Sequence, residues 1–144
     1  MYERKRKMEI SDEMNKLTYK IIGICMEVHK VVGPGFPEEY YQNALEYEFP
    51  IQEVAAVAQK PLAMMYKLRQ IGSCFLDFEI EEKLILEIKS VNRLTDVHMF
   101  QVLKYLSVGN YEIALLINFG NAKLDYHRIL PTSKWQEFKK IHSR

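Results

Sequence analysis

Two helical patterns open the chain. Between Ser11 and Gly33, apolar residues recur three or four positions apart, which is the spacing of one helical face. The predicted buried face consists of Leu17, Ile21, Ile24, Val28 and Val31. The glycine and proline residues at 33–35 are expected to end this helix in a tight turn, and a second helix is predicted from Pro37 to Phe49.

After the second helix, the pattern changes to short apolar runs divided by polar turns, which indicates β-strands. We expect strands over residues 62–66, 71–80, 84–89, 112–118 and 124–130, and a helix over residues 95–108. Residues 50–60 suit either a helix or a strand. The third strand is apolar on both faces and the fourth is almost entirely apolar, so both are expected inside the sheet. The last strand carries more polar residues and is expected at an edge.

The end of the chain carries one more helical pattern. Thr132 or Ser133 can cap a short helix after Pro131 breaks the last strand. Its apolar face would be Trp135, Phe138 and Ile141. The order of these elements predicts an α/β fold with a mixed central β-sheet flanked by helices. We expect a charged flexible tail over residues 1–10 and a single domain over residues 11–144.

Length, charge and cysteine content limit the number of domains, the class of partner and the compartment that we expect. A chain of 144 residues fits one domain, and its formal net charge of +1 excludes a global basic field for nucleic acid. Cys25 and Cys74 have neither metal-ligand nor disulfide spacing, so we expect buried free thiols in a reducing compartment. Neither a signal peptide nor a membrane-spanning run is evident in the sequence. We therefore expect a soluble cytoplasmic protein.

Charged side chains interrupt two of the predicted strands. Because side chains alternate along a strand, Asp77 lies on one face of its strand, and Glu87 and Lys89 share a face of the next. A tight hairpin at residues 81–83 could bring the three together. Carboxylate oxygens suit Mg²⁺, and a nearby lysine can orient water or offset charge on a phosphate. The alternative is a solvated charged face, but unpaired charge on such an apolar strand is costly.

Two motifs give this stretch a known counterpart. Asp77, followed ten residues later by Glu87-Ile88-Lys89, resembles the D…(D/E)xK signature of the PD-(D/E)xK nuclease superfamily. Upstream, Gly35, Glu38 and Tyr41 fit the pattern G-x-x-E-x-x-Y. With the motifs around them, they resemble the GxxExxY protein family, a small bacterial group placed among nuclease-like proteins of that superfamily.

A third motif lies on the helix predicted over residues 95–108. Gln101 and Tyr105 fit the Q-x-x-x-Y motif of the RecB-type branch of these nucleases, and His98 shares their helix face. His98 and His29 could each face a site, although we expect a structural or surface role for both. The alternative for Gln101 and Tyr105 is an ordinary amphipathic helix surface.

The resemblance implies a restriction-endonuclease-like αβββαβ core and a metal-dependent nuclease that acts on nucleic acid, DNA rather than RNA. It implies Mg²⁺ or Mn²⁺ as the cofactor, with ligands from Asp77, Glu87, Ile88 (through its backbone carbonyl) and Glu38. It implies catalytic roles for Asp77, Glu87, Lys89, Gln101 and Tyr105. The alternative is a non-catalytic nucleic-acid- or protein-binding module that keeps the fold. A homodimer or a protein partner could supply a wider binding surface than this small, nearly neutral chain offers.

Overall fold

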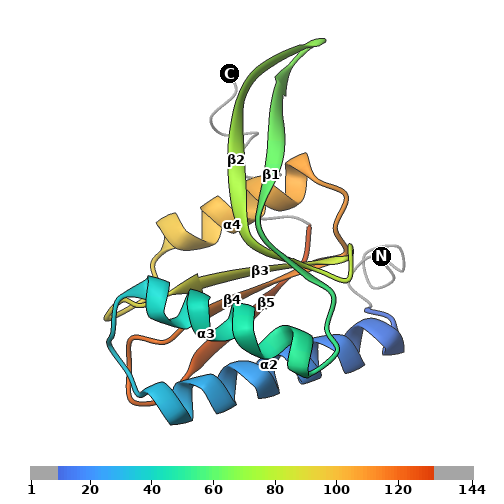
Figure 1. Ribbon diagram of the computed structural model, residues 1–144. Coiled ribbons are helices and arrows are strands. Elements are labelled where there is room, and N and C mark those ends of the chain that lie inside the picture. Colours follow the sequence, from blue (N-terminus) through green and yellow to red (C-terminus); the bar gives the residue numbers. More distant parts are fainter. Residues whose placement is uncertain (1–9, 132–144) are drawn as a thin grey trace, which may run out of the picture.

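The structure is a computed structural model that describes residues 10–131. Of the charged tail predicted over residues 1–10, only Ile10 is described, and it is half-buried against the core. The helix predicted after Pro131 lies outside the described residues. The described part contains three helices and five strands (Figure 1). In chain order they are α2 (Asp12–Val32), α3 (Glu38–Ile51), β1 (Ala56–Tyr66), β2 (Arg69–Ile80), β3 (Leu84–Lys89), α4 (Asp96–Val108), β4 (Ile113–Asn118) and β5 (Asp125–Ile129).

The five strands form one mixed sheet in the order β1-β2-β3-β4-β5. Neighbouring strands are antiparallel except β3 and β4, which run parallel and are connected through α4. The predicted α/β fold with a mixed sheet is therefore confirmed. The apolar strands β3 and β4 are internal and the more polar β5 is an edge strand, as their sequences predict.

Two predicted boundaries were wrong. Residues 50–60, which suited either a helix or a strand, contain both the end of α3 at Ile51 and the start of β1 at Ala56. The first strand therefore begins well before residue 62, where it was predicted to start. The turn expected over residues 67–70 shortens to two residues between the strands, and Lys67 adopts a left-handed φ of 53°. The hairpin of β1 and β2 is consequently longer than the sequence pattern indicates.

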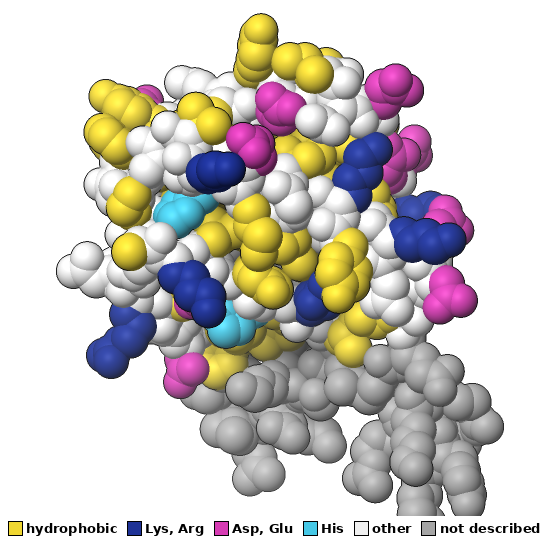
Figure 2. Space-filling view, turned by 90° about the horizontal axis from the view of Figure 1, so that it is seen from below, with side chains coloured by type: hydrophobic (Ala, Val, Ile, Leu, Met, Phe, Trp, Pro, Cys, Tyr) yellow, Lys and Arg dark blue, Asp and Glu magenta, His cyan; other side chains and the backbone are white. Residues whose placement is uncertain are grey.

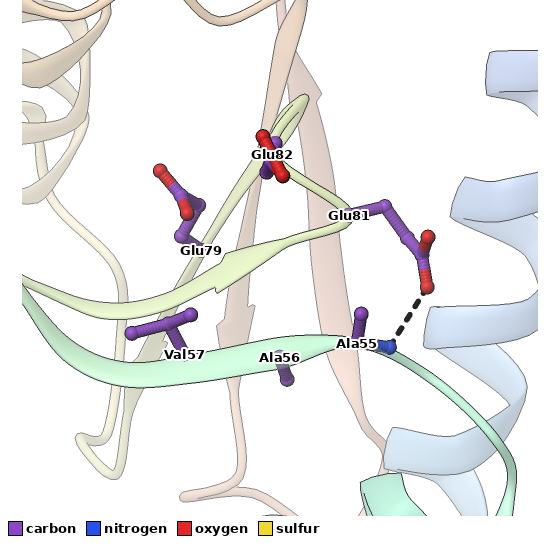
Figure 3. Close-up of a pocket in the computed structure, with 6 residues that line it drawn as sticks. All are labelled: Ala55, Ala56, Val57, Glu79, Glu81 and Glu82. Atoms are coloured by element: carbon purple, nitrogen blue, oxygen red, sulfur yellow. Dashed lines mark hydrogen bonds between the residues drawn. The ribbon is translucent and has the colours of Figure 1, made fainter.

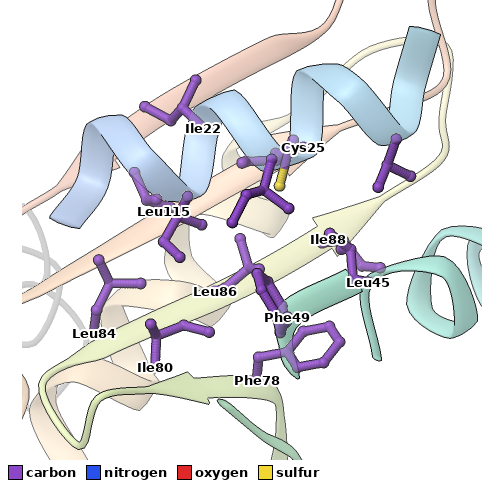
Figure 4. Packing of buried hydrophobic residues seen from close by; sticks show 14 of the residues in the cluster. Ile22, Cys25, Leu45, Phe49, Phe78, Ile80, Leu84, Leu86, Ile88 and Leu115 are labelled. Carbon is purple, nitrogen blue, oxygen red and sulfur yellow. The ribbon is translucent and has the colours of Figure 1, made fainter. Parts of the chain in front are cut away.

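The helices cover both faces of the sheet. On one face, α2 and α3 pack over alternate residues of β3, and Figure 4 shows this larger core. Its labelled members are Ile22, Cys25, Leu45, Phe49, Phe78, Ile80, Leu84, Leu86, Ile88 and Leu115. On the other face, α4 packs over Ile85 and the facing residues of β4. The predicted buried face of α2 was wrong at Val31, whose surface is 75% exposed at the end of the helix.

Both cysteines are free thiols. Cys25 is buried, as expected, but the expected burial of Cys74 was wrong, because this residue is only half-buried on β2. Within residues 10–131, no helix combines the length and the apolar character that crossing a membrane requires.

Candidate active site at the fork between β2 and β3

The candidate site lies where β2 and β3 separate. Their ladder ends at the pair of Phe78 and Leu86, and two carboxylates occupy the fork beyond it. Asp77 Oδ2 accepts a hydrogen bond from the Ile88 N–H at 2.9 Å, and Glu87 Oε1 accepts one from the Asp77 N–H at 2.9 Å. Each carboxylate thus satisfies a backbone donor of the opposite strand that the ladder no longer pairs. The structure therefore brings Asp77 and Glu87 together.

A change of face in β2 creates the fork. Leu76 packs in the core under α4, whereas Phe78, two residues later, packs in the core under α2 and α3. Regular alternation would place both on one face, so the strand must bend between them. On β1, Gln59 lies opposite this bend with a left-handed φ of 51°. On the other side, Gln42 Nε2 of α3 donates to the Asp77 carbonyl oxygen at 3.4 Å.

The Glu87 carboxylate lies in a strained electrostatic environment. Glu87 is only 3% exposed. Burial raises its pKa well above the usual value, and the negative charge of Asp77 raises it further, while Lys89 lowers it. Lys89 therefore offsets only part of the negative charge of Asp77 and Glu87. A divalent cation bound between the two carboxylates would offset the rest.

Helix α4 supplies the second side of the site. Burial raises the pKa of Tyr105 to about 12, and the negative charges of Glu87 and Asp77 contribute to the increase. A side-chain hydrogen bond with Gln101, one turn earlier on α4, acts in the opposite direction. Tyr105 and Gln101 are both half-buried. The helix face predicted from the Q-x-x-x-Y spacing thus does turn toward the carboxylates.

Helix α3 brings Glu38 to the edge of the site. Glu38 is exposed as a residue, yet partial burial of its carboxyl group and the charge of Asp77 raise its pKa, and Lys89 lowers it. These influences place Glu38 near both residues. Among residues 10–131, however, no three or more His, Cys, Asp or Glu side chains are grouped as a metal cluster. Glu38 therefore lies near the two fork carboxylates without forming such a cluster with them.

The turn before α3 determines where Glu38 lies. The Tyr41 hydroxyl donates to the Gly33 carbonyl oxygen at 2.6 Å and accepts from the Phe36 N–H at 3.1 Å. Gly35 has a left-handed φ of 79°, and its N–H donates to the Phe119 carbonyl oxygen at 3.2 Å. The glycine and the tyrosine of G-x-x-E-x-x-Y therefore fix the start of the helix that carries the glutamate.

Two groups near the site were not identified from the sequence. Gln42 bonds the backbone of Asp77, and Cys74 is close enough to Glu87 for the carboxylate charge, after burial, to raise its thiol pKa. Gln42 follows Glu38 by four residues, so its position on the same helix face was a usable signal. Cys74 gave no such signal, because strand alternation is interrupted between it and Asp77.

The histidines have structural contacts. His98 Nδ1 accepts a hydrogen bond from the Thr95 N–H at 2.9 Å, at the N-terminus of α4. His29 Nε2 lies 2.8 Å from the Asn121 carbonyl oxygen, with which it forms a hydrogen bond. These contacts agree with the structural role expected for both.

A separate hollow of about 270 Å³ lies near the β2–β3 turn (Figure 3). Glu79, which borders it, is bonded by the Tyr111 hydroxyl at 2.6 Å and pairs with Lys60 at 3.8 Å. Glu81 Oε2 accepts from the Ala55 N–H at 2.8 Å and closes one side. These carboxylates already have partners, and none of the fork residues lines the hollow.

Comparisons with known proteins concern the family and the fold. A family model described as the PD-(D/E)XK nuclease superfamily matches residues 15–129. The solved structure titled "Crystal structure of SSO0001" is similar in fold, with a TM-score of 0.56 at 14% sequence identity. The match covers 73% of this chain and 55% of that chain, so this protein spans about half the length of its structural relative. No curated protein matches the chain.

Proposed function

This chain belongs to the PD-(D/E)XK nuclease superfamily, and we propose that it is a metal-dependent nuclease that cleaves DNA rather than RNA at the fork between β2 and β3. The observation that carries the proposal is the reciprocal bonding of Asp77 and Glu87 to each other's strands. It holds two acidic groups side by side in a mostly buried place, with Lys89 beside them. We place this activity in the cytoplasm, which suits the two free thiols.

The donor set fits a hard divalent cation such as Mg²⁺ or Mn²⁺. Asp77 and Glu87 supply carboxylate oxygens, and Mg²⁺ commonly takes one or two carboxylates while it keeps several waters. The Ile88 N–H points into the fork, and in a strand the carbonyl of the same residue points the same way. The Ile88 carbonyl is therefore the natural third oxygen. When bound, the cation would polarise the phosphate and make a water molecule a stronger nucleophile.

The chain's own residues would do the remaining work. Lys89 would orient the attacking water and offset negative charge that develops on the phosphate. Tyr105, whose pKa of about 12 keeps it protonated at neutral pH, would donate a hydrogen bond to the nucleic-acid strand. Gln101 bonds Tyr105 and would hold the strand with it. Glu38 would bind a water of the cation from the α3 side.

The test is metal binding and cleavage by Asp77→Asn. Asparagine can still accept the hydrogen bond from the Ile88 N–H, so the fork keeps its shape while it loses one charge. Calorimetric titration with Mn²⁺ should show binding to the wild-type protein and a decrease in affinity of at least about tenfold in the variant. Labelled DNA and RNA, single- and double-stranded, identify the substrate with Mg²⁺ present.

The matched control is Glu79→Gln, which removes a second buried carboxylate from the same strand but outside the fork. It should bind Mn²⁺ and cleave DNA like the wild-type protein. If the wild-type protein does not bind Mn²⁺ at millimolar concentrations of the metal, the proposed nuclease function is wrong. Binding at the fork without cleavage of any substrate would instead favour a nucleic-acid-binding module that keeps the fold.

A further inference from the structure

The hairpin of β1 and β2 continues beyond the sheet as a two-stranded arm. Within residues 10–131, β2 has no strand partner past the fork except β1, and the two strands project from the body of the molecule (Figure 1). The base of the arm rests against the α4 core through Leu62. Residues 65–73 at its far end, which we call the arm tip, are all exposed.

The arm tip carries positive charge without a compensating acid. Residues 54–76 contain three basic residues and no acidic residue. Lys60, at the base, pairs with Glu79 at 3.8 Å, but in the described part of the chain neither Lys67 nor Arg69 forms an ion pair with a carboxylate. The face turned away from the arm differs, because basic, acidic and apolar side chains are interspersed there (Figure 2). Positive charge is therefore concentrated locally, although the net charge is only +1.

Apolar side chains lie among these cations. Leu68, between Lys67 and Arg69 at the turn, is 99% exposed. Tyr66, Ile71 and other large apolar side chains of the arm are exposed as well. An exposed apolar patch of this kind indicates a binding surface. Its partner must also match two cations that form no ion pair with a carboxylate of the described residues. This favours a polyanion with apolar surfaces, and stacked bases joined by phosphates have this character.

We propose that the arm binds the nucleic acid on which the fork acts, with Lys67 and Arg69 on phosphates and Leu68 against the bases. The inference rests on the proposed nuclease function for its substrate. A two-stranded ribbon fits the major groove of B-DNA, and exposed leucine or isoleucine side chains can wedge against base steps in the narrower groove. The Lys67 ammonium lies 5.4 Å from the centroid of the Tyr66 ring, whose other face can take an unpaired base.

The position of the arm supports this partner. The arm begins at Asp77, beside the place where the cleaved phosphate would lie. From Asp77 to Arg69 the strand advances eight residues, which is about 26 Å at roughly 3.3 Å per residue. That length corresponds to about eight base pairs of B-DNA at roughly 3.4 Å each. One duplex can therefore contact the fork and the arm tip at once.

The experiment measures DNA binding by fluorescence anisotropy, with a labelled 20-base-pair duplex and EDTA present so that cleavage does not intervene. The arm variant is Lys67→Asn with Arg69→Gln. Asparagine tolerates the left-handed φ of 53° at position 67, so the turn is kept. The control is Lys16→Gln with Lys20→Gln, which removes the same charge from the exposed face of α2.

We expect the arm variant to bind DNA at least about tenfold more weakly at 50 mM salt. The slope of log affinity against log salt concentration should be smaller by the equivalent of about two phosphate contacts. The control should stay within about twofold of the wild-type affinity. Equal affinities of the arm variant and the control would overturn the proposal. Thermal denaturation checks that the variants fold, which their exposed positions lead us to expect.

Leu68→Ser distinguishes nucleic acid from a protein partner. We expect it to weaken duplex binding as well. If it instead abolishes self-association in sedimentation and leaves DNA affinity unchanged, the arm is a contact between copies of the chain and the proposal is wrong. Cleavage is measured separately with Mg²⁺. If binding depends on the arm but no cleavage occurs, the proposal for the arm stands and the proposed nuclease function is wrong. If cleavage occurs but binding does not depend on the arm, the nuclease function stands and the proposal for the arm is wrong.

Discussion

At the scale of single residues, hydrogen bonding and charge repulsion oppose each other at the fork when no cation is bound. Asp77 and Glu87 must both be near to bond the opposite strands, but their charges repel in a place that water hardly reaches. The backbone donors compensate only in part, as the raised pKa of Glu87 shows. This tension is typical of functional sites, and it is one reason for our proposal that the fork binds a cation.

The first prediction concerns Glu87→Gln. Burial and the Asp77 charge raise the pKa of Glu87, so the folded state binds a proton more readily than the unfolded chain. The stability of the metal-free wild-type protein should therefore fall as pH rises from the usual value of 4.5 through the raised pKa. The variant should unfold about 3 °C or more above the wild-type protein at pH 7.5, and at nearly the same temperature at pH 4. Thermal denaturation with a chelator at both pH values measures this, and a variant less stable at both would contradict it.

The second prediction concerns Lys89→Met. Loss of the ammonium group should lower kcat by a factor on the order of 10²–10³, because charge developing on the phosphate is no longer offset. Mn²⁺ affinity should stay the same or increase, since a positive charge near the carboxylates is removed. Cleavage kinetics and calorimetry on one preparation separate these effects. If Mn²⁺ binding is lost together with activity, Lys89 maintains the fork rather than the chemistry.

At the scale of elements, the connections after β3 and β4 position Lys89. Asn118, fully buried at the end of β4, accepts hydrogen bonds from the N–H groups of Val91 and Gly120 and donates to the Val91 carbonyl oxygen. The Phe119 N–H donates to the Lys89 carbonyl oxygen at 2.8 Å. The two loops are thus held together directly behind the lysine.

The third prediction compares two glycines in this light. A Cβ at Gly120 would clash with the Val91 carbonyl oxygen, so Gly120→Ala must displace the loop. We expect it to lower the free energy of unfolding by about 1–3 kcal/mol. Gly23→Ala is the matched control, because its Cβ meets nothing within 4 Å on the exposed side of α2. It should stabilise by about 0.5–1 kcal/mol through helix propensity. Urea denaturation measures both, and equal effects would show that the loop contact is not limiting.

At the scale of the whole molecule, the described residues form two parts, a body with a buried core on each face of the sheet and an exposed arm tip. The body, made of the sheet with its helices, buries both cores and the fork, whereas the arm tip adds exposed surface without core residues. In the described part of the chain, only β1 and β2 connect the arm tip to the body. The body should therefore fold and bind metal without the tip.

The fourth prediction tests this division by shortening the arm. Ala63 and Ser73 are opposite each other in the ladder, so replacing residues 64–72 with Asn-Gly should close a two-residue hairpin there. The shortened protein should unfold within about 3 °C of the wild-type temperature. Calorimetry should give the wild-type affinity for Mn²⁺. Loss of cooperative unfolding would mean that the tip supports the body and would contradict the division.

Much of the fold follows from local pattern. The 3.6-residue period of α2, the caps around it and the apolar runs of β3 and β4 are enough to place these elements, because each depends on residues close in sequence. Val31 was misplaced because periodicity cannot tell where a helix outruns the sheet that it covers. The length of the arm was missed for a similar reason, since its exposed strands bury no regular stripe.

The candidate site shows the same limit more sharply. Sequence spacing alone determined that Asp77, Glu87 and Lys89 lie on neighbouring strands, and it marked Gln101 and Tyr105 as one helix face. Only the tertiary structure decided that β2 bends at Asp77. There Gln59 of the partner strand has a left-handed φ, and Gln42 of α3, 35 residues away in sequence, bonds the Asp77 carbonyl oxygen. Such long-range contacts interrupt strand alternation where the chain itself gives no local signal. They open the fork in which the two carboxylates meet.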